Sequence, residues 1–376
     1  MKIRKWSSFA TVLALFAAAV LFQTARDTSV EAQSQIGSTP VKSKEEGGVR
    51  MLGTQDAPAM EAISILSEET LDKASVEAQA RGGSEELVPI PFPLPGGLDY
   101  VANGTGTRNA GFGSIRLRGV PFGAVAVRAI LYWGVITAPP AAGTATAVFQ
   151  GTTVTGSLVG TTAEPCWNGS GVFAGYRANV LGLLAPGTNA DYSVAGLSSS
   201  VTTGANPWAP FVNSLPLSEG ASLVVVYSHS SLPATASVVI TQGPKRFDNG
   251  TFDFIHGLRS AVPSHTALKH TRLGGDGQVG IAIPGSGLRS VAGITNEQTF
   301  IGRPLAGVLT QIKGIGALLN QDSDWNGYDG DPLNKLWDTH TDDITGAIAA
   351  GDTSYTVRYV AGLDCCVWLV HILGAR

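Results

Sequence analysis

Short segments that alternate apolar and polar residues recur from about residue 97 to the end of the chain. Ser114–Gly119 alternates isoleucine and leucine with arginine, and Val125–Ile136 is a longer run of β-branched and aromatic residues. Such patterns are typical of strands, and the Gly, Pro and Asn clusters between them are typical of turns. Further segments of this kind are Thr144–Phe149, Thr152–Val159, Asp191–Leu197, Ser222–Tyr227, Ser237–Thr241, Val279–Ile283, Thr353–Ala361 and Cys366–Leu373.

Two of the segments lack the alternation. Leu223–Tyr227 and Val367–Val370 are continuous apolar runs, which are typical of central strands buried on both faces. We therefore expect an all-β fold over 97–376, built as one large, jelly-roll-like β-sandwich. Two packed sub-sandwiches with a seam near Leu232–Pro233 are the alternative. Helical spacing occurs only in Tyr176–Leu184 and Leu305–Leu319, so few short helices are expected.

The N-terminus has the pattern of an export signal. Three basic residues within the first five positions precede the uncharged, mostly apolar run Phe9–Phe22. This order is typical of a signal peptide, and a membrane-spanning helix usually needs about 20 apolar residues. Val30–Ala32 offers a cleavage site, with Ala25 as a second option, so residues 1–32 are expected to be a signal peptide. An uncleaved membrane anchor is the alternative.

Residues 33–96 differ in composition from the rest of the chain. They contain Lys-Glu-Glu runs and glycine pairs, with one weakly helical stretch at Ala57–Arg81. Such composition buries too little apolar surface to offset the entropy of ordering. Val88–Pro95 then has a proline at every second position, which favours extended backbone. We expect a polar spacer here, or else a removable pro-segment that masks a site.

Charge and glycine content exclude some classes of partner. Cleavage after Ala32 removes four of the 25 basic residues and two of the 29 acidic ones, which leaves a net charge of −6. This mild acidity argues against a nucleic-acid partner or an anionic membrane surface, since both favour a clustered basic face. Only 14% of the residues are charged and 47 are glycine, which favours a turn-rich β protein.

An acidic loop gives the sharpest local signal for a metal. Residues 322–327 match the Asp-x-Asp-x-Asn-Gly opening of a calcium loop. Calcium prefers several hard oxygen ligands, which short carboxylates two positions apart can supply. Leu333 stands at the twelfth position, where a regular EF-hand has an acid. The expected calcium ligands are therefore Asp322, Asp324, Asn326, Asp329 and Asp331, and a solvated acidic turn is the alternative.

A second candidate site follows directly along the chain. Asp338, His340 and Asp342 alternate, and side chains two apart on a strand share a face. These three residues could form a metal-dependent hydrolytic site if further ligands came from His371 or His256. The alternative is that they hydrogen-bond to neighbouring protein groups.

The three cysteines predict one disulfide. In an oxidising compartment a pair is expected to bridge, and adjacent strand residues point to opposite faces. Cys166 should therefore pair with Cys365 or Cys366, closing a loop of about 200 residues. The remaining thiol is expected to be buried.

Several segments spread over most of 100–376 form a familiar set, namely Arg118–Val125, Ala129–Trp133, Tyr176–Val180, Tyr192–Val194, Glu219–Tyr227, Trp337–Ile344 and Asp364–Trp368. Together they resemble a family of secreted bacterial β-rich domains that occur alone or on large surface proteins. That family has no assigned activity, so the resemblance implies location and fold without any chemistry.

The expected function is that of a secreted or cell-surface (or periplasmic) structural and adhesive β-sandwich with a calcium-stiffened loop. Its partner would be a cell-surface or extracellular matrix component, including glycans. No catalytic residue is assigned, and no membrane span is expected after signal removal. The alternatives are a carbohydrate-binding module or a metal-dependent extracellular hydrolase. Loop tryptophans that could stack on sugars would support the former, namely Trp167, Trp208, Trp325 and Trp337.

Overall fold

The computed structural model places the chain in two compact units, Met1–Val49 and Arg50–Arg376, and every residue described below lies in the second. The structure describes residues 84–87, 97–139, 141, 144–167, 170–205, 214–248, 251–257, 267–275, 298–303, 308–313, 336–349, 352, 354–361 and 365–376. These residues form antiparallel sheets and two short 3-10 helices, which confirms the expected all-β sandwich class.

Residues from Leu98 to Ser228 build two of the sheets. Sheet I has the strand order β3-β9-β5-β6, and sheet II has the order β2-β10-β4-β8-β7. The strand bounds are β2 Leu98–Gly106, β3 Gly113–Arg116, β4 Val125–Thr137, β5 Thr146–Phe149, β6 Thr152–Thr155, β7 Ser157–Ala163, β8 Val172–Asn179, β9 Asp191–Ala195 and β10 Leu217–Ser228.

Residues from Ser237 onward, together with the short segment Ser84–Leu87, build the other two sheets, so the main change of sheet falls in the interval that contains Leu232–Pro233. Sheet III has the order β1-β11-β18-β13-β16, and sheet IV has the order β12-β17-β14-β15. Their bounds are β1 Ser84–Leu87, β11 Ser237–Asp248, β12 Thr251–Gly257, β13 Leu268–Gly275, β14 Gln298–Arg303, β15 Val308–Lys313, β16 Trp337–Asp343, β17 Ser354–Val360 and β18 Cys365–Ala375.

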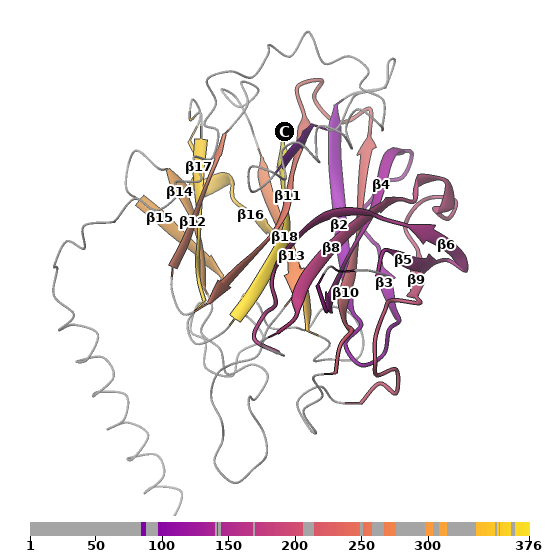
Figure 1. Cartoon of the computed structure of the whole chain (residues 1–376). Coiled ribbons are helices and arrows are strands. Elements are labelled where there is room, and N and C mark those ends of the chain that lie inside the picture. The colour runs from indigo at the N-terminus through magenta and orange to yellow at the C-terminus, as the bar shows by residue number, and fades with distance from the viewer. Residues whose placement is uncertain are drawn as a thin grey trace, which may run out of the picture. The chain divides into compact units, whose positions relative to one another are not determined.

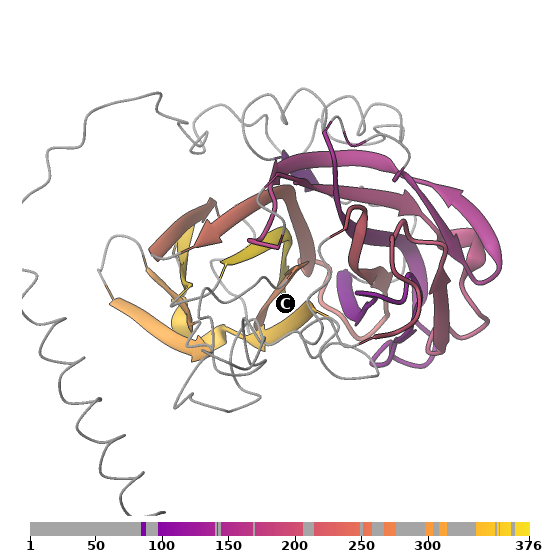
Figure 2. The same ribbon diagram turned by 60° about the horizontal axis from the view of Figure 1, so that its bottom comes forward.

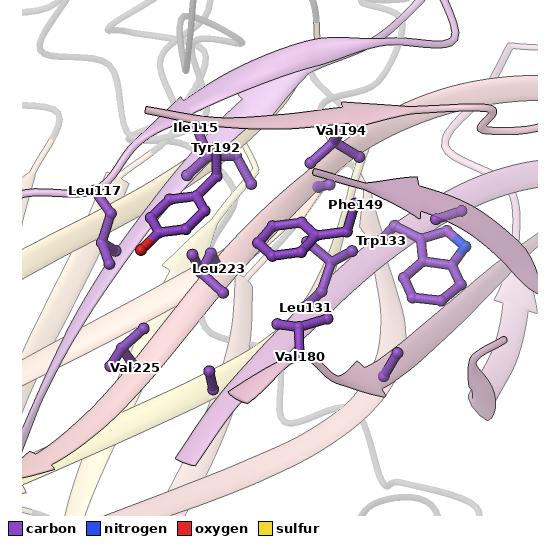
Figure 3. Close-up of a cluster of buried hydrophobic side chains, with 14 of the residues drawn as sticks. Ile115, Leu117, Leu131, Trp133, Phe149, Val180, Tyr192, Val194, Leu223 and Val225 are labelled. Carbon is purple, nitrogen blue, oxygen red and sulfur yellow. The ribbon is translucent and has the colours of Figure 1, made fainter. Parts of the chain in front are cut away.

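Three apolar cores separate the four sheets. One lies between sheets I and II and is drawn in Figure 3, where Leu131 and Leu223 of sheet II face Phe149 and Tyr192 of sheet I. A second core joins sheet II to sheet III, and a third joins sheet III to sheet IV. The order of layers within this unit is therefore I, II, III, IV, which can be followed from right to left in Figure 1. A second view shows the sheets from below (Figure 2).

Burial along each strand follows from its layer. The outer strand β9 alternates exposed and buried residues, as its sequence alternates. The inner strands β10 and β18 are buried at every position, because sheets II and III are covered on both faces. The continuous apolar runs thus lie in inner strands, as predicted.

A row of glycines crosses sheet II beneath sheet III. In register, Gly106 lies opposite Gly220, Gly220 opposite Gly134, Gly134 opposite Gly175, and Gly175 opposite Gly160. A Cβ atom on Gly220 would stand 2.3 Å from the ring of Trp337, and one on Gly175 would stand 2.3 Å from Leu369. The missing side chains therefore make room for the large residues of sheet III.

Both predicted helices are wrong in the described part of the chain. Tyr176–Asn179 belongs to β8, which pairs with β4, and only Leu181–Leu183 forms a 3-10 turn. Val308–Lys313, within Leu305–Leu319, is β15 and pairs with β14. Cross-strand pairing overrides the local apolar spacing in both cases. Val279–Ile283 lies outside the described residues.

Candidate functional site

The predicted calcium ligands cannot be placed. Asp322, Asp324, Asn326, Asp329 and Asp331 lie outside the described residues, so calcium binding there stays a prediction. Among the residues that the structure does describe, no group of three or more His, Cys, Asp or Glu side chains is arranged to hold a metal ion.

The second candidate set lies on β16. Asp338, His340 and Asp342 are on the face of sheet III that looks toward sheet IV, but they form two separate pairs. The Oδ1 atom of buried Asp338 lies 3.1 Å from Nε2 of His340. Asp342 instead accepts a hydrogen bond of 2.5 Å from Nη1 of Arg272, whose side chain is fully buried.

Cross-strand register explains why Arg272 takes part. On β13, Arg272 lies opposite His340 of β16 and opposite His371 of β18, and His270 lies opposite Asp342. Six polar side chains from three adjacent strands thus share one inner face, and we call them the inner polar layer: Asp338, His340, Asp342, His270, Arg272 and His371.

Two buried histidines form the centre of this layer. His270 Nε2 lies 2.9 Å from His371 Nδ1, so one ring nitrogen donates and the other accepts. His371 also lies 3.4 Å from the hydroxyl of Tyr359, on β17 of sheet IV. His371 is therefore buried between His270 and Tyr359. The side chain of His256 lies outside the description.

Burial dominates the electrostatics on the sheet IV side. It raises the pKa of the Tyr359 hydroxyl well above its ordinary value, while the charge of Arg272 opposes that rise. Tyr359 is therefore a neutral hydrogen-bonding group at any physiological pH. The inner polar layer can hold strands in register through directional contacts, as satisfied buried networks do.

A second buried charged group lies at the junction of sheets II and III. Arg108 forms an ion pair with Glu219, and both side chains are fully buried. The guanidinium also lies 4.2 Å from the ring centroid of Trp167, whose backbone N–H donates to buried Glu164. We call Arg108, Glu164, Trp167 and Glu219 the junction cluster.

The junction cluster holds two carboxyl groups and one guanidinium. Burial raises the pKa of Glu219 to about 7, Arg108 opposes the rise, and Glu164 adds to it. Two carboxylates beside one cation would leave a net negative charge in a region shielded from water. A proton bound by Glu219 near neutral pH relieves that charge.

A third contact fixes the C-terminus onto sheet II. Buried Asp99, at the start of β2, forms ion pairs with Lys269 and with Arg376 and accepts a hydrogen bond from the Tyr227 hydroxyl. Burial lowers the pKa of Lys269, and Asp99 opposes that shift. The last residue of the chain is thereby tied to the first strand after the proline run.

One disulfide joins the two pairs of sheets. Cys166, in the segment between β7 and β8, is bonded to Cys365, the first residue of β18, with 6.0 Å between their Cα atoms. This confirms the predicted pairing and selects Cys365. Cys366 points into the core between sheets III and IV and is buried, as adjacent strand residues face opposite ways.

Two of the four tryptophans can be placed. Trp167 and Trp337 are 2% and 0% exposed, so both belong to cores and cannot stack on an external sugar ring. Trp208 and Trp325 lie outside the described residues. These two placements remove two of the four tryptophans that supported carbohydrate binding.

Sequence reasoning singled out Asp338, His340, Asp342 and His371 of the inner polar layer. It missed His270 and Arg272 as members of that layer, and it missed the ion pair of Arg108 with Glu219. Arg108 and Glu219 are 111 positions apart, and nothing local marks them as partners. The only signal was a charged residue, Glu219, four positions before the apolar run Leu223–Tyr227 of β10. His270 and Arg272 alternate on β13, which the sequence did not mark as a strand.

Comparisons with known proteins add little beyond the fold class. No protein-family model matches the chain, and no curated protein matches it in sequence. Among solved structures, the major capsid protein P2 from bacteriophage PM2 is similar over 74% of this chain and 98% of its own, with 12% identity and a TM-score of 0.22. A likeness at that score carries no argument about function. Within the described part of the chain, no helix is long and apolar enough to cross a membrane.

Proposed function

We propose that the protein is an exported structural module, adhesive at the cell surface or in the periplasm, without a reaction of its own. The observation that carries this proposal is the disulfide between Cys166 and Cys365. Such bonds form and persist in oxidising compartments outside the cytoplasm. The bond closes a loop of 199 residues and ties sheet II to sheet III. Such a link suits a structural protein that must stay folded in the presence of proteases or under mechanical force.

The polar groups of the interior support the non-catalytic part of the proposal. Asp338 contacts His340, Asp342 contacts Arg272, and Glu219 contacts Arg108, so each lies against a partner inside the fold. A general acid or nucleophile must instead face a substrate. These contacts favour a role in stabilising the sheets.

The proposal is tested by retention and turnover measured together. Purified oxidised protein is passed over glycan and matrix-protein arrays and incubated with ester, glycoside, phosphoester and peptide substrates. We expect retention on at least one array component, weakened several-fold in the Cys166→Ala/Cys365→Ala variant, and no turnover. Turnover that is lost in His340→Ala would contradict the proposal, and so would retention on neither array.

We further propose that calcium binds the 322–331 loop, on the strength of its Asp-x-Asp-x-Asn-Gly opening. A ligand that binds only the folded state raises the melting temperature. We expect the melting temperature to be higher with calcium than with chelator. This difference should be lost in Asp324→Ala and kept in Asp276→Ala. The second variant removes one carboxylate from another glycine-rich segment. Equal melting with calcium and chelator in the parent protein would remove calcium from the proposal.

A further inference from the structure

A short strand from the N-terminal side covers the edge of sheet III. β1 pairs antiparallel with β11, with Ser84 opposite Gln242 and Leu87 opposite Val239. The other neighbour of β11 is β18. Without β1, the backbone groups of Val239–Gln242 would form a sheet edge ready to pair with another strand.

The end of β1 and the start of β2 lie beside almost the same stretch of chain. Leu87 is opposite Val239, and the N–H of Leu98 donates to the carbonyl of Ala236 at 2.9 Å. Val239 and Ala236 are three positions apart, a separation of roughly 10 Å along a strand. The connection between β1 and β2 within one chain must therefore close a short gap.

The connecting sequence is poorly suited to closing that gap. Val88–Pro95 carries prolines at 89, 91, 93 and 95. Each proline fixes its own φ and biases the residue before it toward extended backbone. At about 3.1 Å per residue, an extended run of this length spans roughly 25 Å. A stiff linker whose preferred length exceeds the span lowers the effective concentration of β1 at its own β11.

We propose that the edge of β11 at Val239–Gln242 is a strand-docking site that takes Ser84–Leu87 from a second copy of this chain. The donated strand makes the same main-chain hydrogen bonds in the same register. Exchange of an identical element between copies costs little, because each contact given up is regained. With exchange, the proline-rich sequence no longer has to close the short gap within one chain. The inference goes beyond the proposed function and does not depend on it.

The test uses cysteines at the paired positions Glu85 and Thr241, which lie opposite each other in the register. Full-length Glu85→Cys and Thr241→Cys proteins, one carrying a size tag, are mixed under mild oxidation. Neither variant can form this bond within one chain. We expect a disulfide-linked heterodimer on a non-reducing gel, several-fold above the yield from mixing Glu85→Cys with Thr152→Cys, which places the second cysteine on exposed β6. Mass spectrometry identifies the linked peptides.

The double variant Glu85→Cys/Thr241→Cys supplies the deciding comparison. With the natural linker it should give chains of linked copies. With Pro89, Pro91, Pro93 and Pro95 all changed to serine, the linkage should shift several-fold toward a bond within one chain. A within-chain bond alone in both linkers, together with no heterodimer above the control, would overturn the proposal. Equal interchain linkage in both linkers would overturn it as well, because the proline run would then have no part in the exchange.

Discussion

The core between sheets I and II and the core between sheets III and IV solve the same packing problem with different chemistry. The first is filled by apolar and aromatic side chains such as Leu223 and Phe149 (Figure 3). The second adds the inner polar layer, with Arg272, His270 and His371 all buried. Apolar burial is non-directional and tolerates repacking, whereas buried polar contacts fix one register. The second pair of sheets should therefore depend more on particular partners.

Loss of the disulfide should have the largest effect, because it joins the two pairs of sheets. A loop of 199 residues corresponds to a chain-entropy contribution of roughly 5 kcal/mol, so Cys166→Ala/Cys365→Ala should lower the free energy of unfolding by about that amount. Urea denaturation followed by tryptophan fluorescence measures it. Cys366→Ala, which leaves the bond intact, is the control and should cost far less. Equal loss in the two variants would show that the bond does not stabilise the fold.

The polar core can be separated from the apolar one by breaking one partner at a time. Asp342→Ala removes the carboxylate that pairs with the buried Arg272 charge and should cost about 3–5 kcal/mol, whereas the double variant Arg272→Met/Asp342→Leu should lie near the parent protein. Urea denaturation of both checks this. In the apolar core, Leu223→Ala should cost about 2–5 kcal/mol with no partner able to rescue it. A double variant as unstable as Asp342→Ala would show that the ion pair of Arg272 and Asp342 itself stabilises the fold, beyond the cost of removing one of its two partners.

The junction cluster should make stability depend on pH. The pKa of Glu219 is raised to about 7 from an ordinary value of 4.5, so the folded protein binds the extra proton. Proton binding by Glu219 adds to the free energy of unfolding. This contribution is fully present below about pH 4.5 and is lost as the pH rises through about 7, a change on the order of 3 kcal/mol. Unfolding free energies of the parent and of Glu219→Gln between pH 4 and 8.5 test this. The unfolding free energy of the parent minus that of Glu219→Gln should fall as the pH rises. A difference that grows with pH would contradict the prediction.

The glycine row predicts the smallest of these effects. Gly220→Ala places a methyl group against Trp337 and should cost about 1–3 kcal/mol through overpacking. Thermal unfolding compared with Gly182→Ala, where the new methyl group meets nothing within 4 Å, isolates the steric part. An equal change in both variants would mean that sheet III does not need this close approach.

The sequence was enough for the fold class and for the strands with the strongest patterns. Apolar runs such as Leu223–Tyr227 gave the inner strands, because burial on both faces removes the alternation. The cysteine count and the expected oxidising compartment predicted one disulfide. The choice of Cys365 depended on which face of β18 points to sheet II, which the sequence does not show. Tyr176–Leu184 was misjudged because pairing with β4, a long-range interaction, outweighs local spacing.

The candidate site was harder to predict for a physical reason. Alternation placed Asp338, His340 and Asp342 on one face, yet the polar residues beside them come from β13 and β18. The register between strands that are distant in the sequence cannot be predicted from any single segment. Arg272 therefore could not be foreseen as the partner of Asp342. The same holds for Arg108 and Glu219, which meet only after sheets II and III stack.

The proposal that a disulfide formed outside the cytoplasm joins the two sandwich halves is tested most directly by peptide mapping. The full chain is expressed with its own N-terminus in a bacterial host, the cells are fractionated, and the protein is digested without reduction. We predict that the folded protein lies outside the cytoplasm, has lost residues 1–32, and yields one linked peptide pair containing Cys166 and Cys365. A folded, protease-resistant protein in the cytoplasm with three reduced thiols would contradict both the export and the structural role of the bond.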